Sequence, residues 1–321
     1  MGQKLRLAIL DDYQNLALSL ADWSRVKEKC EITVFTSNMT PDEAAIALQP
    51  FEMVIVMRER MPFRRELIEK LSNLKFIVST GARNRGLDSD AAREHGILVT
   101  HTSNLHAAAT TLELTWALIL AAARNIPYED RAMRRGAWQE TLGMRLVDRT
   151  LGLVGFGKLG SAVAKIGQAF GMKTIAWSQN LTAEKAAAGG AELVTKEELF
   201  RRSDVVSIHL VLSERTRGLV GAKEFALMKP DAIFLNTSRG PIVDEAALVD
   251  TMQRKAIRRA ALDVFDVEPL PKDHVLRTLD NVVLSPHLGY ASEDNYRQYF
   301  VDAVENIEAW FAGAPIRVTL D

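Results

Sequence analysis

The chain has 321 residues, more than one hydrophobic core usually serves, so we expect two domains. Hydrophobic residues make up 47% and charged residues 25% of the sequence, which is the composition of an ordinary soluble globular protein. The 40 basic and 41 acidic residues give a net charge of -1, so no basic excess favours nucleic acid or a membrane surface as a partner.

The apolar segments are too short for a secretion signal or a membrane span. The run at residues 5–10 is interrupted by Arg6, and the longest candidate, residues 112–123, contains Glu113. The one cysteine, Cys30, has no partner for an internal disulfide, which fits a reducing compartment. We therefore expect a cytoplasmic protein.

Short, continuous apolar runs alternate with helical patterns along the chain, as is typical of parallel strands covered by helices on both faces. The first series of expected strands is Leu5–Leu10, Glu31–Phe35, Met53–Met57, Phe76–Ser79 and Leu98–Thr100. The second series is Thr150–Val154, Lys173–Trp177, Asp204–His209, Ala232–Asn236, Arg259–Asp263 and Val282–Leu284. Because the strand–helix–strand rhythm occurs twice, we predict two doubly wound, parallel-sheet α/β domains.

Between the two series lies a helical region from about residue 104 to residue 135. Its segment AATTLELTWALILAAARNI is apolar on nearly all sides, which predicts that it is well buried. The segment RAMRRGAW that follows is charged and ends at Trp138. These features fit either burial within one subunit or a subunit interface, and the residues alone leave both open.

A glycine motif, Gly155-x-Gly157-x-x-Gly160, follows the first strand of the second series. It opens an expected helix over residues 158–170 and leads into another strand, which is the context that a dinucleotide-binding motif requires. Gly155 permits the tight turn, Gly157 lets the backbone approach a pyrophosphate, and Gly160 lets helix and strand pack closely. The helix N-terminus would offer free N–H groups to the phosphates.

The usual acidic partner of the ribose 2′-hydroxyl is missing from its expected place. After Trp177 the chain has Ser178, Gln179 and Asn180, and the nearest cation is Lys185. No carboxylate repels a 2′-phosphate there, and no arginine attracts one. The choice between NAD and NADP therefore stays open, with a slight preference for NAD.

Three polar residues follow the carboxyl ends of expected parallel strands in the second series. Arg239 lies in NTSRGPIVDE, Glu268 in LDVFDVEPLP and His287 in VVLSPHLGY. Ligands of open α/β sheets bind at that edge, so these side chains are expected to converge on one crevice. Each residue alone has a structural explanation, but the set behind a dinucleotide motif favours catalysis.

At these segments the chain resembles the D-isomer-specific 2-hydroxyacid dehydrogenases, a family that includes 3-phosphoglycerate dehydrogenases and glyoxylate/hydroxypyruvate reductases. The resemblance covers nearly the whole chain and includes LKFIVSTG, AAREHGILVT, the glycine motif, SDVVSIHL and the three segments just quoted. It implies a Rossmann cofactor domain, residues 102–289, inserted in a flavodoxin-like substrate domain, residues 1–101 and 290–321. It also implies a homodimer.

The resemblance implies a role for each of the three residues in hydride transfer at C2 of a small 2-keto or D-2-hydroxy acid. His287 would be the acid/base that gives or takes the proton of the C2 oxygen. Glu268 would bond the other ring nitrogen and favour the charged imidazole, and Arg239 would hold the substrate carboxylate. The nicotinamide cofactor, NAD or NADP, would carry the hydride.

Matching segments imply the other binding residues, and no metal ligands are among them. Cofactor contacts are expected at the pyrophosphate, the adenosine and the nicotinamide, from Gly155, Gly157, Lys158, Leu159, Gly160, Ser178, His209, Leu210, Val211, Thr237, Asp263 and Gly289. Asp263 would accept a hydrogen bond from the carboxamide. The substrate is expected to contact Arg58, Gly81, Ala82, Arg83 and Asn84. Arg58, Arg60, Arg83 and Arg85 together suit a substrate with a second anionic group, although some of them are expected to be solvated.

Two other classes of function remain as alternatives. Some relatives act as corepressors, so the chain is alternatively a non-catalytic, NAD(H)-sensing scaffold of the same fold. A different Rossmann enzyme, such as a methyltransferase, is a third reading. Turnover of 2-keto acids separates the first alternative from an enzyme, and binding of NADH or of S-adenosylmethionine separates the second.

Overall fold

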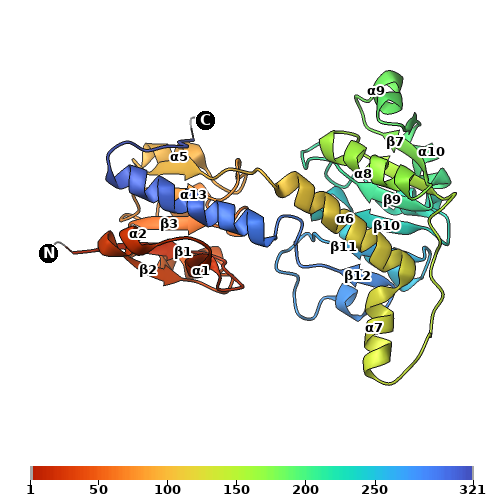
Figure 1. The fold of residues 1–321 in the computed structure, drawn as a ribbon, viewed down its shortest axis with the longest axis horizontal. Helices are drawn as coiled ribbons and strands as arrows, with labels where there is room; N and C mark the ends of the chain where they lie inside the picture. The colour runs from red at the N-terminus through yellow and green to blue at the C-terminus, as the bar shows by residue number, and fades with distance from the viewer. Residues whose placement is uncertain (1–2, 320–321) are drawn as a thin grey trace. The chain divides into compact units, whose positions relative to one another are not determined.

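The chain folds as two units, each built on its own parallel sheet (Figure 1). The structure is a computed structural model that describes residues 3–319. The first unit comprises residues 1–106 and 291–321, and the second comprises residues 107–290. The first unit is therefore discontinuous in sequence, with the second unit inserted into it.

The first unit contains a five-stranded sheet in the order β2-β1-β3-β4-β5, in which every neighbouring pair is parallel. This is the order of the flavodoxin-like fold, and it changes direction between β1 and β3. The strands are β1 (Leu5–Ile9), β2 (Cys30–Val34), β3 (Met53–Val56), β4 (Phe76–Ser79) and β5 (Leu98–His101).

Helices cover the first sheet, and the last of them comes from the C-terminal end of the chain. They are α1 (Ala17–Leu20), α2 (Ser24–Lys29), α3 (Pro41–Ala47), α4 (Arg65–Ile68), α5 (Ser89–Glu94) and α13 (Glu293–Phe311). Trp310 of α13 stacks on Phe76 of β4, with ring centroids 5.3 Å apart and planes 4° from parallel. This packing fixes the returning helix to the sheet (Figure 1).

The second unit contains a seven-stranded parallel sheet in the order β12-β11-β10-β9-β6-β7-β8. The order changes direction between β6 and β9, as in a Rossmann fold, where the ligand crevice lies at that point. The strands are β6 (Thr150–Val154), β7 (Lys173–Trp177), β8 (Glu192–Leu193), β9 (Val205–Ile208), β10 (Ile233–Asn236), β11 (Arg259–Leu262) and β12 (Val282–Leu284).

Both faces of the second sheet are buried by helices. On β10, Phe234 packs into the apolar cluster on one face, whereas Ile233 and Leu235 pack into the cluster on the other. The helices are α6 (Ala107–Arg124), α7 (Ile126–Arg134), α8 (Lys158–Ala169), α9 (Ala183–Ala188), α10 (Lys196–Arg202), α11 (Ala222–Leu227), α12 (Glu245–Gln253) and the 3-10 turns η1 (Gly240–Ile242) and η2 (Val275–Thr278).

The predicted fold class, a Rossmann domain inserted in a flavodoxin-like domain, is confirmed, while some details differ. The helical region at residues 104–135 is two helices, because Asn125 takes a left-handed conformation with φ of 60° and Pro127 lies in the first turn of α7, where a proline is tolerated. Helix α6 is also less buried than expected, with Ala108, Ala109 and Ala117 exposed. No helix among residues 3–319 has the length and apolar character needed to cross a bilayer.

Candidate active site and cofactor site

The turn between β6 and α8 has no room for side chains at two of its glycines. Gly155 has φ of 99°, and a Cβ there would lie 2.4 Å from the carbonyl oxygen of His209. A Cβ at Gly160 would lie 2.3 Å from the carbonyl oxygen of Gly155, so helix and turn are in close contact. Beside Gly157, in contrast, a Cβ would meet nothing within 4 Å. The turn thus leaves open space at the helix N-terminus.

The first N–H groups of α8, at Lys158 and Leu159, lie at that N-terminus and have no partner within the helix. Together with the positive end of the helix dipole they suit a pyrophosphate. The open space at Gly157 and these unpaired donors fit a dinucleotide better than a purely structural glycine turn.

The loop after β9 closes one side of the glycine turn. The imidazole Nε2 of His209 lies 2.8 Å from Oγ of Ser207, while its Nδ1 is buried without a hydrogen-bond partner among residues 3–319. Burial lowers the pKa of His209 from 6.5 to about 4, so the ring is neutral at physiological pH. Leu210 is half-buried and Val211 is exposed.

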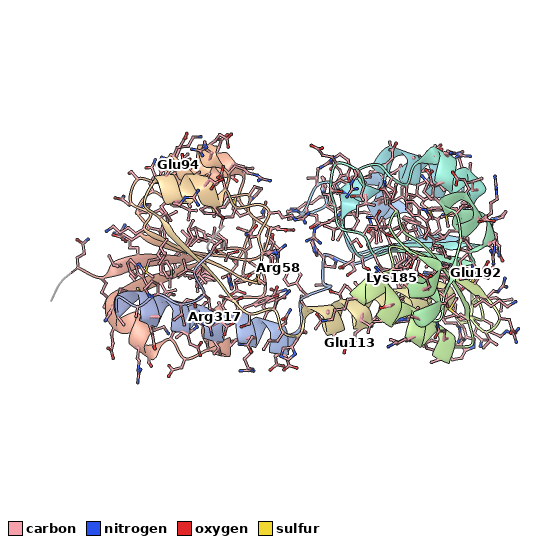
Figure 2. The ribbon with its side chains drawn as sticks, turned by 90° about the horizontal axis from the view of Figure 1, so that it is seen from above. Arg58, Glu94, Glu113, Lys185, Glu192 and Arg317 are labelled. Atoms are coloured by element: carbon pink, nitrogen blue, oxygen red, sulfur yellow. The ribbon has the colours of Figure 1, made fainter. Side chains whose placement is uncertain are left out.

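The segment after β7 carries no acidic side chain. Ser178 is half-buried and its carbonyl oxygen accepts a 3.1 Å hydrogen bond from the N–H of Leu181, whereas Gln179 and Asn180 are exposed. Lys185, labelled in Figure 2, is exposed on α9. The segment therefore offers neither a carboxylate nor an arginine to a nucleotide ribose, and the choice between NAD and NADP stays open.

His287 and Glu268 form a close pair in the second unit. Nδ1 of His287 lies 2.5 Å from Oε2 of Glu268, and the other carboxylate oxygen accepts a 2.9 Å hydrogen bond from the N–H of Phe265. The carboxylate is thereby oriented before it meets the ring. Nε2 of His287 has no hydrogen-bond partner among residues 3–319, so this nitrogen is available to bond another group.

The backbone at His287 and one ring contact orient the imidazole. His287 has a φ of 54°, in the left-handed region, which turns its side chain out of the line of β12. The ring of Tyr290 packs against it edge to face, with centroids 5.6 Å apart and planes at 77°. Tyr290 itself is buried, so packing holds its ring in place beside the imidazole. The sequence offered no clear signal for this role of Tyr290.

Asp263 organises the loop that carries His287. This fully buried carboxylate accepts hydrogen bonds from Oγ of Ser285 at 2.5 Å, the N–H of Leu288 at 2.8 Å and the N–H of Gly289 at 3.0 Å. Burial raises the pKa of Asp263, and the bond from Ser285 opposes that rise. Its observed partners therefore all belong to the loop that carries His287.

Arg239 and Thr237 follow the neighbouring strand, β10. The register aligns Asn236, the last residue of β10, with Leu262 of β11, and Leu262 with Leu284 of β12, so these three strands end at one edge. Arg239 donates from Nη1 to the carbonyl oxygen of Ser238 at 2.7 Å. Thr237 is buried, with its hydroxyl 3.1 Å from that of Thr115.

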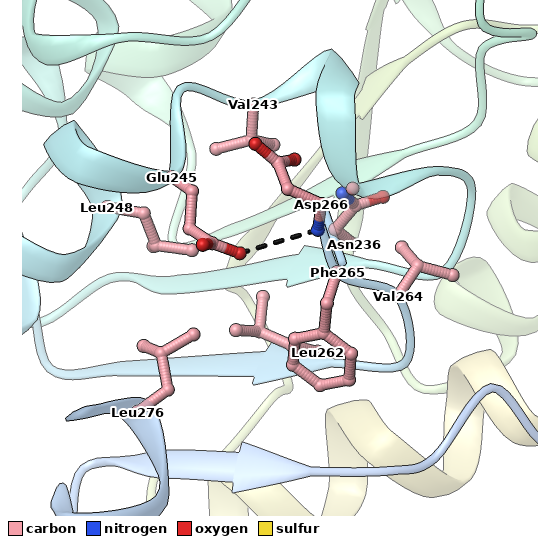
Figure 3. A pocket seen from close by; sticks show the side chains of 10 residues that line it. Asn236, Val243, Glu245, Leu248, Leu262, Val264, Phe265, Asp266 and Leu276 are labelled. Atoms are coloured by element: carbon pink, nitrogen blue, oxygen red, sulfur yellow. Dashed lines mark hydrogen bonds between the residues drawn. The ribbon is translucent and has the colours of Figure 1, made fainter. Parts of the chain in front are cut away.

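A second histidine–carboxylate pair, His274 and Glu245, lies in the second unit, and the sequence analysis did not predict it. Nε2 of His274 is 3.1 Å from Oε1 of Glu245, whose other oxygen accepts a 3.4 Å bond from the N–H of Asp266 (Figure 3). Glu245 and Asp266 border a cavity of about 10 Å³, room for one water, also lined by Asn236 and Phe265. The pair braces the loop that leads to Glu268.

In the first unit, two loops at the carboxyl ends of β3 and β4 are tied together. The N–H of Arg58 donates to Oγ1 of Thr80 at 2.9 Å, and the side-chain amide of Asn84 donates to the carbonyl oxygen of Arg58 at 2.6 Å. Gly81 has φ of 82°, and a Cβ there would lie 1.9 Å from Nη1 of Arg58. Ala82 and Arg83 are exposed.

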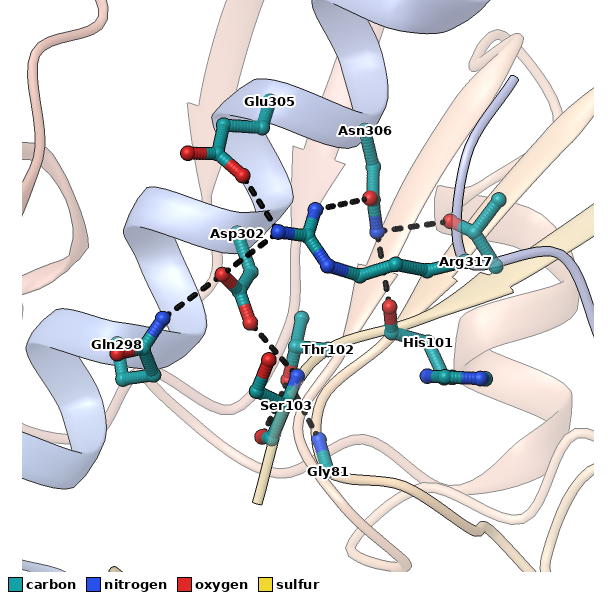
Figure 4. A network of polar contacts seen from close by, with 10 residues as sticks. Gly81, His101, Thr102, Ser103, Gln298, Asp302, Glu305, Asn306 and Arg317 are labelled. Atoms are coloured by element: carbon teal, nitrogen blue, oxygen red, sulfur yellow. Dashed lines mark hydrogen bonds and ion pairs between the residues drawn. The ribbon is translucent and has the colours of Figure 1, made fainter. Parts of the chain in front are cut away.

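A polar network anchors this loop to α13 (Figure 4). The N–H of Gly81 donates to the hydroxyl of Thr102 at 2.7 Å, and the N–H of Ser103 donates to the buried carboxylate of Asp302 at 2.6 Å. Asp302 also accepts from Gln298 at 2.8 Å and pairs with Arg317 at 3.2 Å. The C-terminal helix therefore helps to fix the backbone next to Gly81.

Comparison with known proteins agrees with this architecture. Residues 116–289 match the family described as "D-isomer specific 2-hydroxyacid dehydrogenase, NAD binding domain". A hydroxypyruvate reductase of Thermotoga maritima is 36% identical, over 88% of this chain and 91% of the relative. The solved structure of a phosphoglycerate oxidoreductase from Vibrio cholerae has a TM-score of 0.90 at 36% identity, covering 97% of this chain and 100% of that one.

A D-3-phosphoglycerate dehydrogenase of Methanocaldococcus jannaschii is 37% identical over 90% of this chain. The matched region is 55% of the relative's length, so this chain spans about half of that longer protein.

Proposed function

Since the chain belongs to the D-isomer-specific 2-hydroxyacid dehydrogenase family, we propose that it transfers a hydride between a nicotinamide cofactor and C2 of a small 2-keto or D-2-hydroxy acid. The observation that carries this proposal is the His287–Glu268 pair, in which Nδ1 is bonded at 2.5 Å and Nε2 is left without a partner among the described residues. An acid/base histidine needs this arrangement, because one nitrogen must be oriented and the other must face substrate.

In the proposed reduction, His287 gives a proton from Nε2 to the oxygen at C2, and in oxidation it takes the proton back. Glu268 compensates the positive charge on the ring while His287 is protonated, and Tyr290 and the backbone at Phe265 hold the pair in place. Arg239 binds the substrate carboxylate. The bound cofactor supplies or accepts the hydride.

The cofactor would be held by the second unit. Gly157, Lys158 and Leu159 would bind the pyrophosphate through the open N-terminus of α8, together with the close turn at Gly155 and Gly160. We propose that the adenosine side lies along Ser178, His209, Leu210 and Val211, and the nicotinamide side along Thr237, Asp263 and Gly289. Since Asp263 already accepts three hydrogen bonds from the loop 285–289, any bond to a carboxamide would add to them.

NAD is the proposed nucleotide, although the segment 178–180 is neutral and repels no 2′-phosphate. With no arginine at these positions to bind that phosphate, NADP gains nothing to offset its larger desolvation. The measurement is kcat/KM for NADH and for NADPH with one substrate. A preference for NADPH of more than about tenfold, equivalent to about 1.4 kcal/mol, would overturn the assignment.

The first unit would bind the substrate acid. Arg58, Gly81, Ala82, Arg83 and Asn84 form the two tied loops, and we propose that the backbone at Gly81 and Ala82 accommodates the carboxylate group. Guanidinium and N–H groups are the donors that carboxylates prefer.

We also propose a cytoplasmic homodimer. The chain has a single cysteine, Cys30, which is buried in β2 and suits a reducing compartment. Apolar side chains are exposed together along α7 and the segment after it, which favours a second copy as their cover. These are Ile126 (57% exposed), Met133 (59%), Trp138 (73%) and Leu142 (88%).

The test of the function is a screen of NADH and NADPH oxidation over a panel of 2-keto acids, including glyoxylate, hydroxypyruvate and pyruvate. An enzyme of this class turns over at least one of them. A protein that binds NADH and turns over none would instead be the non-catalytic, NAD(H)-sensing scaffold. A protein that binds S-adenosylmethionine and not NADH would be a different Rossmann enzyme.

A further inference from the structure

The loop after β4 leaves a run of backbone donors unused. Among residues 3–319, the N–H groups of Ala82, Arg83 and Asn84 donate to no other group, while the N–H of Gly81 is bonded to Thr102 (Figure 4). Gly81 has a positive φ, which begins the turn. Successive unpaired N–H groups after such a residue are typical of loops that bind an anion. One carboxylate group can satisfy them.

Arg58 adds a fixed positive charge to the same loop. Its guanidinium lies where a Cβ of residue 81 would be, 1.9 Å from Nη1, so only glycine permits this approach. Its backbone is held at both ends, by Thr80 at the N–H and by Asn84 at the carbonyl. Figure 2 labels Arg58 at this edge of the first unit. The single negative charge of a carboxylate bound at the N–H groups of residues 82–84 is thus already balanced by the positive charge of Arg58.

The four arginines of these loops have different surroundings. Arg60 donates to the carbonyl oxygen of Asp11 at 2.6 Å and to the hydroxyl of Tyr296 at 3.1 Å, and its guanidinium stacks 4.4 Å from the ring centre of Tyr13. It is committed to the protein. Arg83, in contrast, is exposed and its guanidinium has no hydrogen bond or ion pair among the described residues.

The neighbouring Arg85 is oriented through its backbone, which donates to Oε1 of Glu59 at 3.3 Å. Glu59 is the one acidic residue in segments 58–61 and 82–85, against Arg58, Arg60, Arg83 and Arg85. Without Arg60, which is bonded within the protein, Arg58, Arg83 and Arg85 against Glu59 leave the two loops a net charge of +2, more than one carboxylate neutralises. The bond from Asn84 to Arg58 and the bond from Gly81 to Thr102 tie down the residues that flank Ala82 and Arg83, so the loop presents the Arg83 side chain from a held backbone.

We propose that the substrate carries a second anionic group, a carboxylate or a phosphate, and that Arg83 recognises it while Arg58 and the loop N–H groups hold the C1 carboxylate. The inference rests on the proposed function and narrows its substrate class to 2-keto acids with two anionic ends. A guanidinium fits both groups through paired hydrogen bonds.

The test compares kcat/KM, with NADH, for acids that differ in the second group. Pyruvate and hydroxypyruvate lack it, oxaloacetate and 2-oxoglutarate carry a carboxylate, and 3-phosphohydroxypyruvate carries a phosphate. The wild type is expected to favour one of the dianionic acids by about tenfold or more. Arg83→Gln is expected to reduce the dianion-to-monoanion ratio by about tenfold, mainly through the KM of the dianion.

The matched control is Arg85→Gln, which removes the same charge from the same loop. If Arg83 makes a direct contact, this control keeps the ratio within about twofold, because it removes a charge without removing paired hydrogen bonds to the anion. Equal losses in both variants, or no preference for dianions in the wild type, would overturn the inference alone. If the wild type turns over no 2-keto acid at all, the proposed function fails and the inference fails with it.

Discussion

At the scale of single residues, the proposed proton transfer depends on an imidazole, that of His287, whose orientation is fixed by its contacts. His287 is bonded at Nδ1 to a carboxylate that is itself held by a backbone N–H, and an aromatic ring supports its side. A ring that needs no reorganisation delivers its proton at lower cost. In the proposed mechanism Tyr290 is therefore a positioning residue, which acts through His287 and not on substrate.

Two variants separate the effect of the aromatic ring of Tyr290 on kcat from the effect of its apolar volume. Tyr290→Leu keeps an apolar side chain but loses the edge-to-face contact, so we expect kcat to fall about threefold to tenfold, as for an aromatic pair of about 0.5–1.5 kcal/mol. The Kd for NADH should stay near the wild-type value. Tyr290→Phe restores the ring and should restore most of kcat. Equal activity of the Leu and Phe variants would show that the ring plays no part.

A buried acid in the first unit gives a prediction about pH. Asp11 is 1% exposed, and neither carboxylate oxygen accepts a well-formed hydrogen bond among the described residues. Burial raises its pKa from 3.8 to about 6, against the opposing charge of Arg60 and the nearby polar groups of Asn38 and Tyr13. Since the folded pKa is the higher one, the folded state loses stability as the pH rises from about 4 to 6.

Asp11→Asn removes that penalty. We expect the free energy of unfolding to rise by about 1–3 kcal/mol at pH 8 and to change little at pH 4, where the wild-type carboxyl is already protonated. Urea denaturation at the two pH values measures it. Asp12→Asn is the contrasting control: its carboxylate accepts bonds from the N–H groups of Leu16 and Ala17 at 3.1 and 2.8 Å, so stability should fall. A loss of stability in Asp11→Asn at pH 8 would contradict the account.

At the scale of elements, the strands were the most predictable feature because central parallel strands must be apolar on both faces. All eleven expected strands correspond to strands of the structure, whereas β8, the short edge strand Glu192–Leu193, was missed. Both of its residues are exposed, so it has no apolar run to recognise. The break between α6 and α7 was also missed, since a left-handed Asn125 has no signature in periodicity.

In the candidate site, too, residues with a local sequence pattern could be predicted and residues without one could not. Glu268 and His287 stood out because each follows a strand and together they match a family pattern. The supports of the site did not stand out: Tyr290, the pair His274–Glu245 and Asp302 act through contacts distant in sequence. Such contacts are fixed by tertiary packing, which no local spacing records.

Asp302 on α13 gives the prediction at this scale. Its buried carboxylate joins the N–H of Ser103, Gln298 and Arg317, and so anchors the segment beside Gly81 to the C-terminal helix (Figure 4). Asp302→Ala leaves these donors without their acceptor, and we expect a loss of about 2–4 kcal/mol in unfolding free energy.

The control for this experiment is Glu305→Ala, which removes the other acidic partner of Arg317. Its side chain is 49% exposed, so solvent replaces the lost contact and the cost should stay below about 1 kcal/mol. Thermal and urea denaturation compare the two variants. If both cost the same, the buried network does not anchor α13.

At the scale of the whole molecule, the exposed apolar side chains of α7 and the following segment predict self-association. The double variant Trp138→Glu with Leu142→Glu places two charges on this surface, and we expect the dimer to dissociate to monomers. Light scattering coupled to size-exclusion chromatography reports the mass. A wild-type protein that is monomeric at micromolar concentration would contradict the dimer, as would an unchanged dimer in the variant.

In the proposed function the first unit binds the substrate acid and the second unit binds the cofactor. The proton transfer itself is assigned to one side chain, His287. The most direct measurement is kcat/KM for NADH-dependent reduction of the best 2-keto acid by His287→Ala, with the Kd for NADH measured alongside. We predict a fall of about 10²–10⁴ in kcat/KM with Kd nearly unchanged, while His95→Ala, which removes an exposed histidine at the end of α5 that contacts the carbonyl oxygen of Ala91, keeps the activity. Turnover by His287→Ala at the wild-type rate would contradict the account.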